Sequence, residues 1–392
     1  MGDWLDGLPL VDHHCHAIVG ESRKADALGA LRATSEAPGG YPLVDLVERP
    51  AWQAVLRVME RFAASPFRLT TGDVSVEGVT TLNWAEKTLS GVDYHRYCTD
   101  LFRAGGYAQL YVDGGYEPEG SVTLSNLARL SGASTRPILR LERLGEDQHT
   151  PGRSFDDWWE RVTQRVRTAR EEGYVAAKSI AAYRTGLHVQ PVSLAEARAA
   201  YTRWGEPVSL QQVAPRLKDK ALIDFLLWHT APLLANQALP LQFHTGYGDP
   251  DTDLLQGNPL WLRGFLETFI PQGLAVVLLH TYPYHREAGY LASVYEGVYF
   301  DVSLIIPMGV SGARRVLAEA LELTSYRRFL FASDAHTRPE MFLLAADTFR
   351  DALAHHFADA VLTHYVSPAV RERWAGLILH ANARKLYLGE EE

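Results

Sequence analysis

The sequence predicts an α/β fold built on a parallel sheet, and three observations point to it. From His244 onward, short apolar runs alternate with amphipathic stretches, and the joins between them are short. This alternation is typical of parallel strands connected by crossover helices. Residues able to bind metal follow several of the apolar runs, and the first run ends in a His-x-His pair. The length of 392 residues also suits an eight-stranded barrel with insertions.

Composition and charge exclude several classes of partner. Hydrophobic residues make up 47% of the chain and charged residues 22%, which is ordinary for a soluble globular protein. The formal net charge is −9, and no basic stripe interrupts it, so we expect no nucleic-acid partner. The N-terminus lacks the pattern of a secretory signal, and no apolar run approaches the roughly 20 residues that cross a bilayer.

Two cysteines do not make a disulfide framework, which favours a reducing compartment. We therefore expect a cytoplasmic protein that acts on a small molecule and binds neither nucleic acid nor membranes. The sequence leaves open whether it forms a homo-oligomer.

The strands can be placed in chain order from their apolar patterns. The first covers about residues 8–14, and the second ends at Asp113 before two glycines. The third is expected around residues 137–144, where alternation would put Arg140 and Glu142 on one face. The later strands are expected in the segments YVAAKSIAAY, LPLQFHTG, LAVVLLH, VYFDVSLI and FLFASDA.

Two long segments separate neighbouring strands, at about residues 20–106 and 184–238. Both contain apolar residues at helical spacing, so we interpret them as helical insertions after strands 1 and 4. No repeat, low-complexity tract or linker divides the chain. Residues 1–392 are therefore expected to form a single domain.

The segment Val11 to His16 carries the clearest metal-binding pattern. In a strand, successive side chains point to opposite faces, so His14 and His16 share one face while Cys15 turns away. Two imidazole nitrogens a few ångströms apart suit a divalent cation such as zinc. The pair supplies only half of a metal site.

Further candidate ligands stand at the ends of later strands. Active sites of barrels gather at the carboxyl ends of the strands, so residues at these ends are expected to converge. Asp334 follows an apolar run with no neighbouring positive charge in the sequence, an arrangement that a bound cation would stabilise. The further candidates are Lys178, His244, His280 and Asp334.

A His-x-His pair followed by Lys, His, His and Asp at successive strand ends resembles the pattern of the amidohydrolase superfamily. The resemblance is strongest to the amidohydrolase-2 branch, and there to the amidohydrolase-like domain that some fungal and plant proteins carry fused to a glutamine-synthetase-like domain. It covers VDHHCH and about residues 174–388. The motifs that carry it are AAKSIAAYRTGL, LPLQFHTGYGDPDTDLLQGNPLWL, VVLLHTYPYHREAGYLASVYEGVYFDVSLIIP, FASDAHTRPEMFLLA and NARKLYLG.

This resemblance implies a (β/α)8 barrel that carries one or two divalent ions, with zinc expected. A bound divalent ion can lower the pKa of water to about 7 and so provide hydroxide. By resemblance, Asp334 accepts the proton of that water and later delivers it to the leaving group. The metal ligands would be His14, His16, Lys178, His244, His280 and Asp334.

Two of these residues have alternative roles. Lys178 is either carboxylated and bridges two ions, or remains an ordinary ammonium that pairs with Asp334 or with a substrate carboxylate. His280 either binds a second ion or stays free to polarise the substrate carbonyl. The sequence does not decide between these alternatives.

The predicted reaction is hydrolysis of an amide, cyclic amide or related C–N bond. A metal-dependent decarboxylase of a small acid is the alternative that keeps the same site, and an inactive binding scaffold is the alternative outside catalysis. Trp52, Trp84 and Trp204 could line a lid, but core packing is the safer interpretation. Candidate substrate-binding residues are Arg140, Tyr183, Arg184, Asp249, Tyr284, Arg286 and His336.

Overall fold

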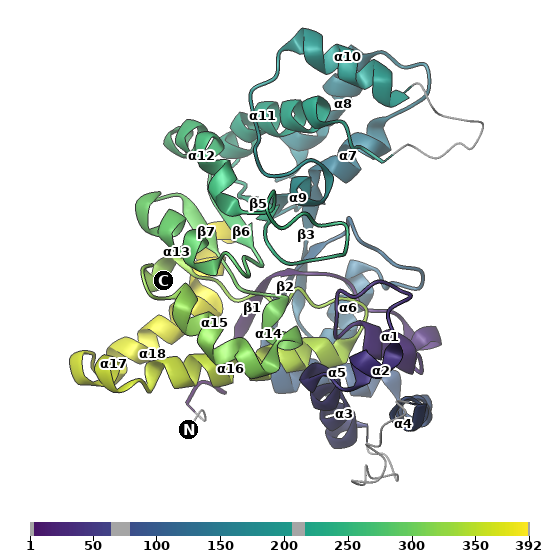
Figure 1. Ribbon diagram of the computed structural model, residues 1–392, viewed down its shortest axis with the longest axis vertical. Coiled ribbons are helices and arrows are strands. Elements are labelled where there is room, and N and C mark those ends of the chain that lie inside the picture. Colours follow the sequence, from purple (N-terminus) through teal and green to yellow (C-terminus); the bar gives the residue numbers. More distant parts are fainter. Residues whose placement is uncertain (1–3, 64–78, 206–215, 391–392) are drawn as a thin grey trace.

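The computed structural model describes residues 4–63, 79–205 and 216–390. Parts of the two predicted insertions, residues 64–78 and 206–215, lie outside the described residues. Within the described residues, seven parallel strands form one sheet in which each strand pairs with the next along the chain (Figure 1). The strands are β1 (Leu10–Cys15), β2 (Tyr107–Asp113), β3 (Ser134–Arg140), β4 (Ala176–Ser179), β5 (Leu241–His244), β6 (Val276–Leu279) and β7 (Val298–Phe300).

The segment 329–335 closes the sheet into a barrel, although its backbone is too irregular to form a full strand. The amide of Leu330 donates to the carbonyl of Phe300 on β7 at 3.1 Å. On the other side, the amide of His13 donates to Phe331 at 3.3 Å, and the amide of Asp334 donates to His14 at 3.1 Å. The predicted eighth strand therefore lies between β7 and β1, and the predicted α/β barrel is confirmed.

Apolar side chains from the strands fill the barrel interior, as the inward positions of a small barrel require. Val11, Tyr111, Ile138 and Val277 form a buried cluster that is separate from the larger core under the helices. Tyr387, near the C-terminus, is fully buried in the same cluster. The C-terminal segment therefore contributes to the packing of the barrel interior.

The register of β1 is irregular between Asp12 and Cys15, and this irregularity affects the histidines. His13 contacts Tyr387 of the inner cluster, and His14 contacts Gln242 of β5, so two consecutive side chains point inward. Cys15 packs in the outer core, as alternation predicts. A regular strand could not place both His13 and His14 inside the barrel.

Helices and short turns connect the strands. Between β1 and β2 lie α1 (Ala27–Arg32), α2 (Leu43–Val47), α3 (Pro50–Phe62), α4 (Val79–Ser90) and α5 (Tyr94–Gly105). Between β2 and β5 lie α6 (Leu124–Ser131), α7 (Leu141–Gln148), α8 (Phe155–Thr168), α9 (Ala181–Arg184), α10 (Leu194–Gly205) and α11 (Lys220–Asn236). After β5 come α12 (Arg263–Phe269), α13 (His285–Val294), α14 (Ile305–Met308), α15 (Ala313–Ala320), α16 (Pro339–Phe357), α17 (Ala360–Tyr365) and α18 (Pro368–Gly376).

Shorter helical turns complete the connections. The 3₁₀ turns are η1 (Glu21–Arg23), η2 (Pro259–Leu262), η3 (Ile270–Gln272), η4 (Val310–Gly312) and η5 (Tyr326–Arg328). The π-helical turns η6 (Leu377–Ala381) and η7 (Arg384–Leu388) end the described chain. None of the helices in the described ranges is long and apolar enough to span a bilayer.

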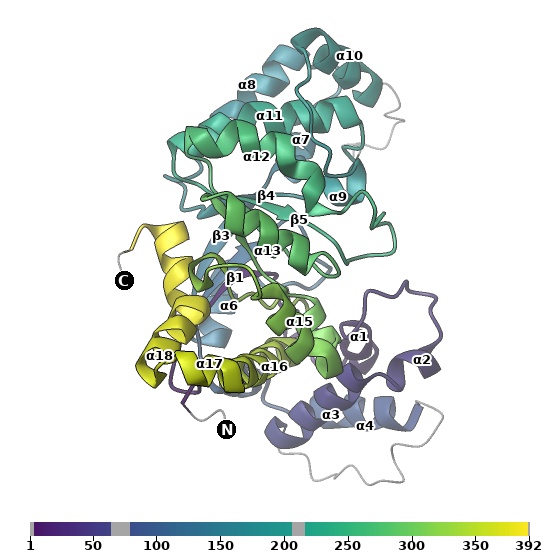
Figure 2. The ribbon, with the colours of Figure 1, turned by 60° about the vertical axis from the view of Figure 1, so that its left-hand side comes forward.

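The two helical groups that follow β1 and β4 lie at opposite ends of the molecule. Helices α1 to α4 occupy one end, and α10 and α11 occupy the other together with α8, as both views show (Figures 1 and 2). Trp52, Trp84 and Trp204 are buried in the core, so the structure gives them a packing role. We propose that residues 1–392 form one barrel domain in which these two helical groups are insertions.

Three predicted strands extend too far into the segments that follow them. The expected third strand, residues 137–144, ends at Arg140, and residues from Leu141 onward form α7. Leu141 and Leu144 are both buried on one face of that helix, so a spacing that suits a strand also suits a helix. Glu142 therefore does not share a strand face with Arg140. The fourth and seventh strands end early in the same way, at Ser179 and Phe300.

Candidate metal centre

Three polar atoms from distant parts of the chain converge at the carboxyl end of β1. Nε2 of His14 lies 3.2 Å from Oδ1 of Asp334, and Nε2 of His16 lies 3.5 Å from the same oxygen. All three residues are buried. His280 approaches from the end of β6, with Nδ1 3.4 Å from Oδ2 of Asp334. The structure therefore brings together four of the residues that the sequence singled out.

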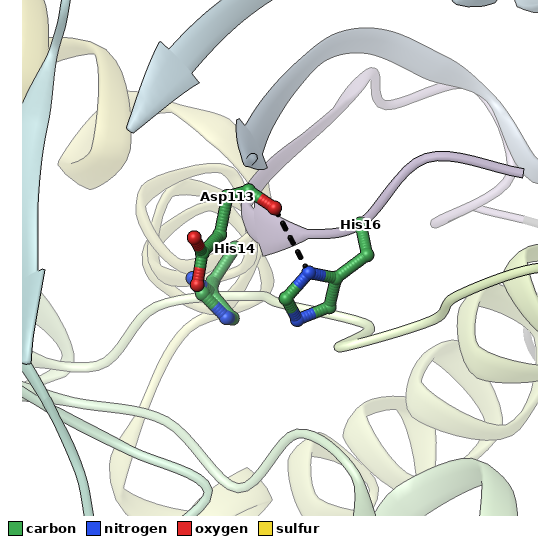
Figure 3. A group of neighbouring side chains, drawn as sticks. All are labelled: His14, His16 and Asp113. Carbon is green, nitrogen blue, oxygen red and sulfur yellow. Dashed lines mark hydrogen bonds between the residues drawn. The ribbon is translucent and has the colours of Figure 1, made fainter. Parts of the chain in front are cut away.

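The other ring nitrogen of each β1 histidine is tied to an acceptor. Nδ1 of His14 lies 2.9 Å from Oε1 of Gln242, and Nδ1 of His16 lies 3.0 Å from the backbone carbonyl of Asp113 (Figure 3). Because both partners are acceptors, each Nδ1 carries the proton in the neutral ring. Each Nε2 then presents a lone pair, as in a metal-ligating histidine.

Two consecutive hydrogen bonds, through Ser303 to Asp301, hold His280 in the same tautomer. The hydroxyl of Ser303 donates to Oδ1 of Asp301 at 2.5 Å, so its oxygen is an acceptor toward Nδ1 of His280 at 2.8 Å. The backbone amide of His280 also donates to Oδ1 of Asp301 at 2.9 Å. Nε2 of His280 is buried and has no hydrogen-bond partner among the described residues. His280, which belongs to one group with His14 and Asp334, thus has a third imidazole lone pair without a partner in the described chain.

Burial keeps the imidazoles of His14 and His280 uncharged. It lowers the pKa of His14 to about 3, with the nearby ammonium of Lys178 acting in the same direction. It also lowers the pKa of His280 to about 4, although Asp334 acts in the opposite direction. Neutral rings bind metal ions, whereas protonated rings do not.

Lys178 lies inside this cluster and has two partners. Its Nζ is 2.8 Å from Nε2 of His14 and 3.1 Å from Oδ2 of Asp113. Burial lowers the pKa of Lys178, while Asp113 acts in the opposite direction. The anionic partner of Lys178 is therefore Asp113, where the sequence interpretation had suggested Asp334 or a substrate.

Asp113 is a site residue that the sequence analysis did not single out. Its carboxylate forms an ion pair with Arg140 and accepts a hydrogen bond from the amide of Gly115 at 2.8 Å. Burial alone would raise the pKa of Asp113, but Arg140 and Lys178 hold it well below the ordinary value. One of its oxygens also lies within 4.8 Å of nitrogens of His14 and His16. Its position at the end of the second strand is the feature of the sequence that could have identified Asp113 as a site residue.

His244 lies beside the cluster at the end of β5. Its ring centroid is 4.5 Å from that of His280 and 4.1 Å from that of Tyr183. Nε2 of His244 is buried without a hydrogen-bond partner among the described residues. His244 does not belong to either group of residues whose ligand atoms all lie within 4.8 Å of one another.

Backbone strain is concentrated at the strand ends that carry this cluster. His280 has φ of 70° and Asp334 has φ of 49°, both in the left-handed region that residues other than glycine rarely adopt. Such strain costs roughly 1–3 kcal/mol per residue and is common where function fixes a side chain. The strained positions are therefore those that direct His280 and Asp334 toward the β1 histidines.

Comparison with known proteins identifies the family. The amidohydrolase family model, Amidohydro_2, matches residues 154–388, which is more than half of the chain. The chain belongs to the amidohydrolase family. This agrees with the resemblance that the sequence motifs indicated.

Individual relatives match over different shares of the chain. A protein of Lactobacillus casei ATCC 334, provisionally described as a metal-dependent hydrolase, is 39% identical with a TM-score of 0.87, covering 99% of this chain and 97% of that one. Protein fluG of Emericella nidulans is 34% identical over 285 residues, 66% of this chain. This amidohydrolase spans about a third of the length of that curated relative, 33%. A uronate isomerase of Thermotoga maritima shares the fold, with 14% identity, a TM-score of 0.68 and coverage of 98% of this chain and 96% of that one.

The metal centre of this amidohydrolase opens into a cavity of about 960 Å³. His16, Lys178, His244, His280 and Asp334 line it. Five of the candidate substrate-binding residues also line it, namely Arg140, Tyr183, Arg184, Asp249 and His336. The other two candidates, Tyr284 and Arg286, do not line the cavity. The hydroxyl of Tyr284 donates a hydrogen bond to the carbonyl of Leu254 at 2.8 Å, and Arg286 forms a surface ion pair with Glu322 at 3.0 Å.

The donor set suits a divalent ion. Oδ1 of Asp334 has no hydrogen-bond partner among the described residues, although it lies close to Nε2 of His14 and of His16. With each Nδ1 protonated, the Nε2 lone pairs face the carboxylate oxygen, an arrangement that is unfavourable unless a cation lies nearby. Nε2 of His14 contacts the ammonium of Lys178 at 2.8 Å and would give up that contact to a metal ion. Imidazole nitrogen with carboxylate oxygen is a ligand combination that zinc favours. The residues therefore fit a bound metal.

Proposed function

We propose that this chain is a zinc-dependent hydrolase that cleaves an amide, cyclic amide or related C–N bond in a small molecule. The observation that carries the proposal is the convergence of the Nε2 atoms of His14 and His16 on Oδ1 of Asp334, with each Nδ1 committed to an acceptor. Membership of the amidohydrolase family supports an enzyme of this superfamily. The similarity to the Lactobacillus casei protein supports a metal-dependent hydrolase.

The proposed metal-binding residues come from β1 and from the ends of later strands. His14, His16 and Asp334 would hold one ion. His244 and His280, whose buried Nε2 atoms have no hydrogen-bond partner within the described part of the chain, would complete its coordination or hold a second ion. A zinc ion bound there supplies a Lewis acid and lowers the pKa of a coordinated water to about 7. The proposed ligands are therefore His14, His16, His244, His280 and Asp334, and Lys178 would join them only if it were carboxylated.

Asp334 is proposed as the residue that moves the proton. Its carboxylate faces the cavity beside the β1 histidines, so it can accept a proton and later return it to the leaving nitrogen. His280 is proposed as a ligand and not as a donor to the substrate carbonyl, because its proton is directed at Ser303. This assignment favours one of the two roles that the sequence left open.

Lys178 has a different role in each of its two forms. As an ammonium it would stabilise negative charge that develops on the substrate oxygen, and its ion pair with Asp113 supports this form. As a carboxylated lysine it would bridge two ions, and the lowering of its pKa by burial supports that form. We propose the ammonium form because the buried carboxylate of Asp113 lies 3.1 Å from Nζ and stabilises its positive charge.

Metal analysis combined with product analysis tests the proposal. The protein is purified from zinc-supplemented cells, its metal content per chain is measured, and the intact mass is examined for a carbon dioxide adduct. It is then incubated with a library of amides, cyclic amides and small carboxylic acids. We expect bound zinc, no adduct, and release of ammonia or amine. Release of carbon dioxide without amine would instead establish a decarboxylase, and absence of metal uptake would contradict the proposal altogether.

A further inference from the structure

Arg184 is a buried arginine on the wall of the cavity with unused hydrogen-bonding capacity. It is the last residue of α9, the short helix that follows β4 and therefore follows Lys178. Its side chain is 6% exposed. Nη1 donates to the carbonyl of Leu217 at 3.2 Å and lies 3.4 Å from Oε1 of Glu146. Nε is buried and has no partner among the described residues, and no described residue bonds to Nη2.

Glu146 does not fully neutralise this arginine. The same Oε1 atom accepts a hydrogen bond from the amide of Leu217 at 2.7 Å, which is shorter than its contact with Arg184. Burial lowers the pKa of Arg184. The negative charge of Glu146 raises it, but by less than burial lowers it. A guanidinium nevertheless keeps its charge in proteins, so Arg184 remains a buried cation that shares the carboxylate oxygen of Glu146 with the amide of Leu217.

Other cationic side chains lie near Arg184. Arg140 and Arg216 both lower its pKa by their charge, while Glu146 and Glu142 act in the opposite direction. Arg140, Arg216 and Glu146 line the same cavity, whose lining elsewhere includes carboxylates such as Asp249 and Asp334. Neighbouring cationic side chains in a cavity attract anions. The arginines at this point therefore favour a negatively charged group on the bound molecule.

The other buried arginine of the wall, Arg140, has no free edge. Its Nε donates to Oδ2 of Asp113 at 3.1 Å, its Nη2 forms an ion pair with the same oxygen, and its Nη1 donates to the carbonyl of Gly115 at 3.2 Å. Arg143 is largely exposed and pairs with Asp147 at 2.9 Å. Arg184 is thus the buried guanidinium on this described wall that keeps an unfilled edge.

We propose that the substrate carries a carboxylate group and that Arg184 binds this group through Nε and Nη2. These two nitrogens form one edge of the guanidinium and match the two oxygens of a carboxylate. The inference rests on the proposed hydrolase function and adds a substrate class to it. Because Arg184 and Lys178 belong to the same β4–α9 unit, the carboxylate would be bound at one side of the cavity while the C–N bond lies at the metal centre.

Benzoate and benzamide have the same shape but differ in charge, so comparing their binding tests the preference for a carboxylate without requiring catalysis. Their dissociation constants are measured calorimetrically on the zinc-loaded wild-type protein, on R184Q, and on the surface control R286Q. Hydrogen bonds to charged groups contribute about 1.5–3 kcal/mol, so we expect wild-type protein to bind benzoate about ten-fold or more tightly than benzamide. R184Q should lose that preference, and R286Q should keep it.

A preference for benzoate that persists in R184Q would overturn the assignment to Arg184, because the metal would then be the source. Equal binding of the two probes to wild-type protein would overturn the proposed substrate class. If R184Q does not fold, R184K replaces it, because lysine keeps the positive charge beside Glu146. Lysine lacks the paired nitrogens of a guanidinium, so R184K should also lose most of the preference for benzoate over benzamide. Failure of the proposed hydrolysis would leave these binding results unchanged, so the two proposals fail separately.

Discussion

Oε1 of Gln242 lies 2.9 Å from Nδ1 of His14 and so decides which nitrogen of that ring can bind a metal. The amide of Gln242 is itself fixed, because its Nε2 donates to the carbonyl of His13 at 3.0 Å. Loss of such an outer partner commonly weakens metal binding 10- to 100-fold. We therefore expect Q242L to raise the dissociation constant for zinc by about that factor, as measured by competition with a chelator.

The same substitution at a surface glutamine distinguishes loss of the contact with His14 from a general effect of replacing glutamine by leucine. Gln272 is exposed, and its Nε2 donates a hydrogen bond to the carbonyl of Thr268 at 2.9 Å. Q272L should bind zinc as the wild-type protein does. Equal zinc affinity in Q242L and Q272L would show that Gln242 does not set the tautomer of His14.

Replacement of Asp334 tests the proposed proton transfer. Asparagine keeps the shape of the side chain but cannot accept a proton at neutral pH, and general acid–base catalysis contributes about 10²- to 10⁴-fold. D334N should therefore lose about that factor in kcat on whichever amide the library identifies, at saturating zinc. The control is D351N, because Asp351 is an exposed partner of Arg314. A rate for D334N within a few-fold of wild type would remove Asp334 from the mechanism.

The buried imidazoles predict how the stability of the metal-free protein depends on pH. The pKa of His280 is lowered to about 4 in the folded state, against about 6.5 in the unfolded chain. Between these values the unfolded state binds the proton and the folded state does not, so stability falls as the pH falls. For one group the slope is about 1.4 kcal/mol per pH unit. The burial of His14 acts with the same sign.

Urea unfolding of the metal-free protein at pH 7, 6 and 5 measures this slope. H280Q should show a slope smaller by about 1.4 kcal/mol per pH unit between pH 6 and pH 5. His95 is exposed, so H95Q should retain the wild-type slope. If H280Q and wild type have the same slope, His280 is not held neutral by the fold.

The ion pair of Arg140 with Asp113 predicts a large loss of stability in R140M. Arg140 supplies Asp113 with two of its nitrogens, and Asp113 is fully buried. Removal of one partner from a buried pair costs about 3–5 kcal/mol, and the lower end of this range applies here because Lys178 remains 3.1 Å from Asp113. The free energy of unfolding of R140M should fall by about this amount. R263M, which breaks an exposed pair with Glu267, should change it by less than about 1 kcal/mol. A loss in R140M no larger than in R263M would contradict this assignment.

The sequence predicted the parts of the site that a strand pattern reveals. His14, His16, His280 and Asp334 each end an apolar run, and parallel strands bring such ends to one rim. The structure places these four side chains within reach of one another. The barrel followed from the alternation of strands and helices together with the motifs.

The residues that hold those side chains could not be predicted in the same way. Gln242 looks like an ordinary polar residue within β5, and Ser303 follows β7 without any metal-binding motif. Gln242 contacts His14 and Ser303 contacts His280, and these contacts between different strands are not encoded by any local pattern. The irregular register of β1 likewise arises from pairing with β2 and is not visible in the order of residues.

Tyr387 links the C-terminal segment to the metal centre, and its hydroxyl predicts a measurable effect on both. This hydroxyl accepts a hydrogen bond from Nε2 of Gln242 at 2.9 Å and lies 3.0 Å from Nδ1 of His13, in a fully buried position. Phenylalanine would leave Nδ1 of His13 without its partner, and a buried polar group without a partner costs about 1–3 kcal/mol. Y387F should therefore lower the free energy of unfolding by about that amount in urea titrations.

The effect of Y387F on zinc should be smaller than that of Q242L. Gln242 keeps its second bond to the carbonyl of His13, so its Oε1 would still face Nδ1 of His14. Tyr365 is 79% exposed, which makes Y365F the control for loss of a hydroxyl without loss of a buried contact. If Y387F were as stable as Y365F, the hydroxyl would have no structural role. If Y387F weakened zinc binding as much as Q242L, the orientation of Gln242 would depend on Tyr387 and not on the backbone of β1.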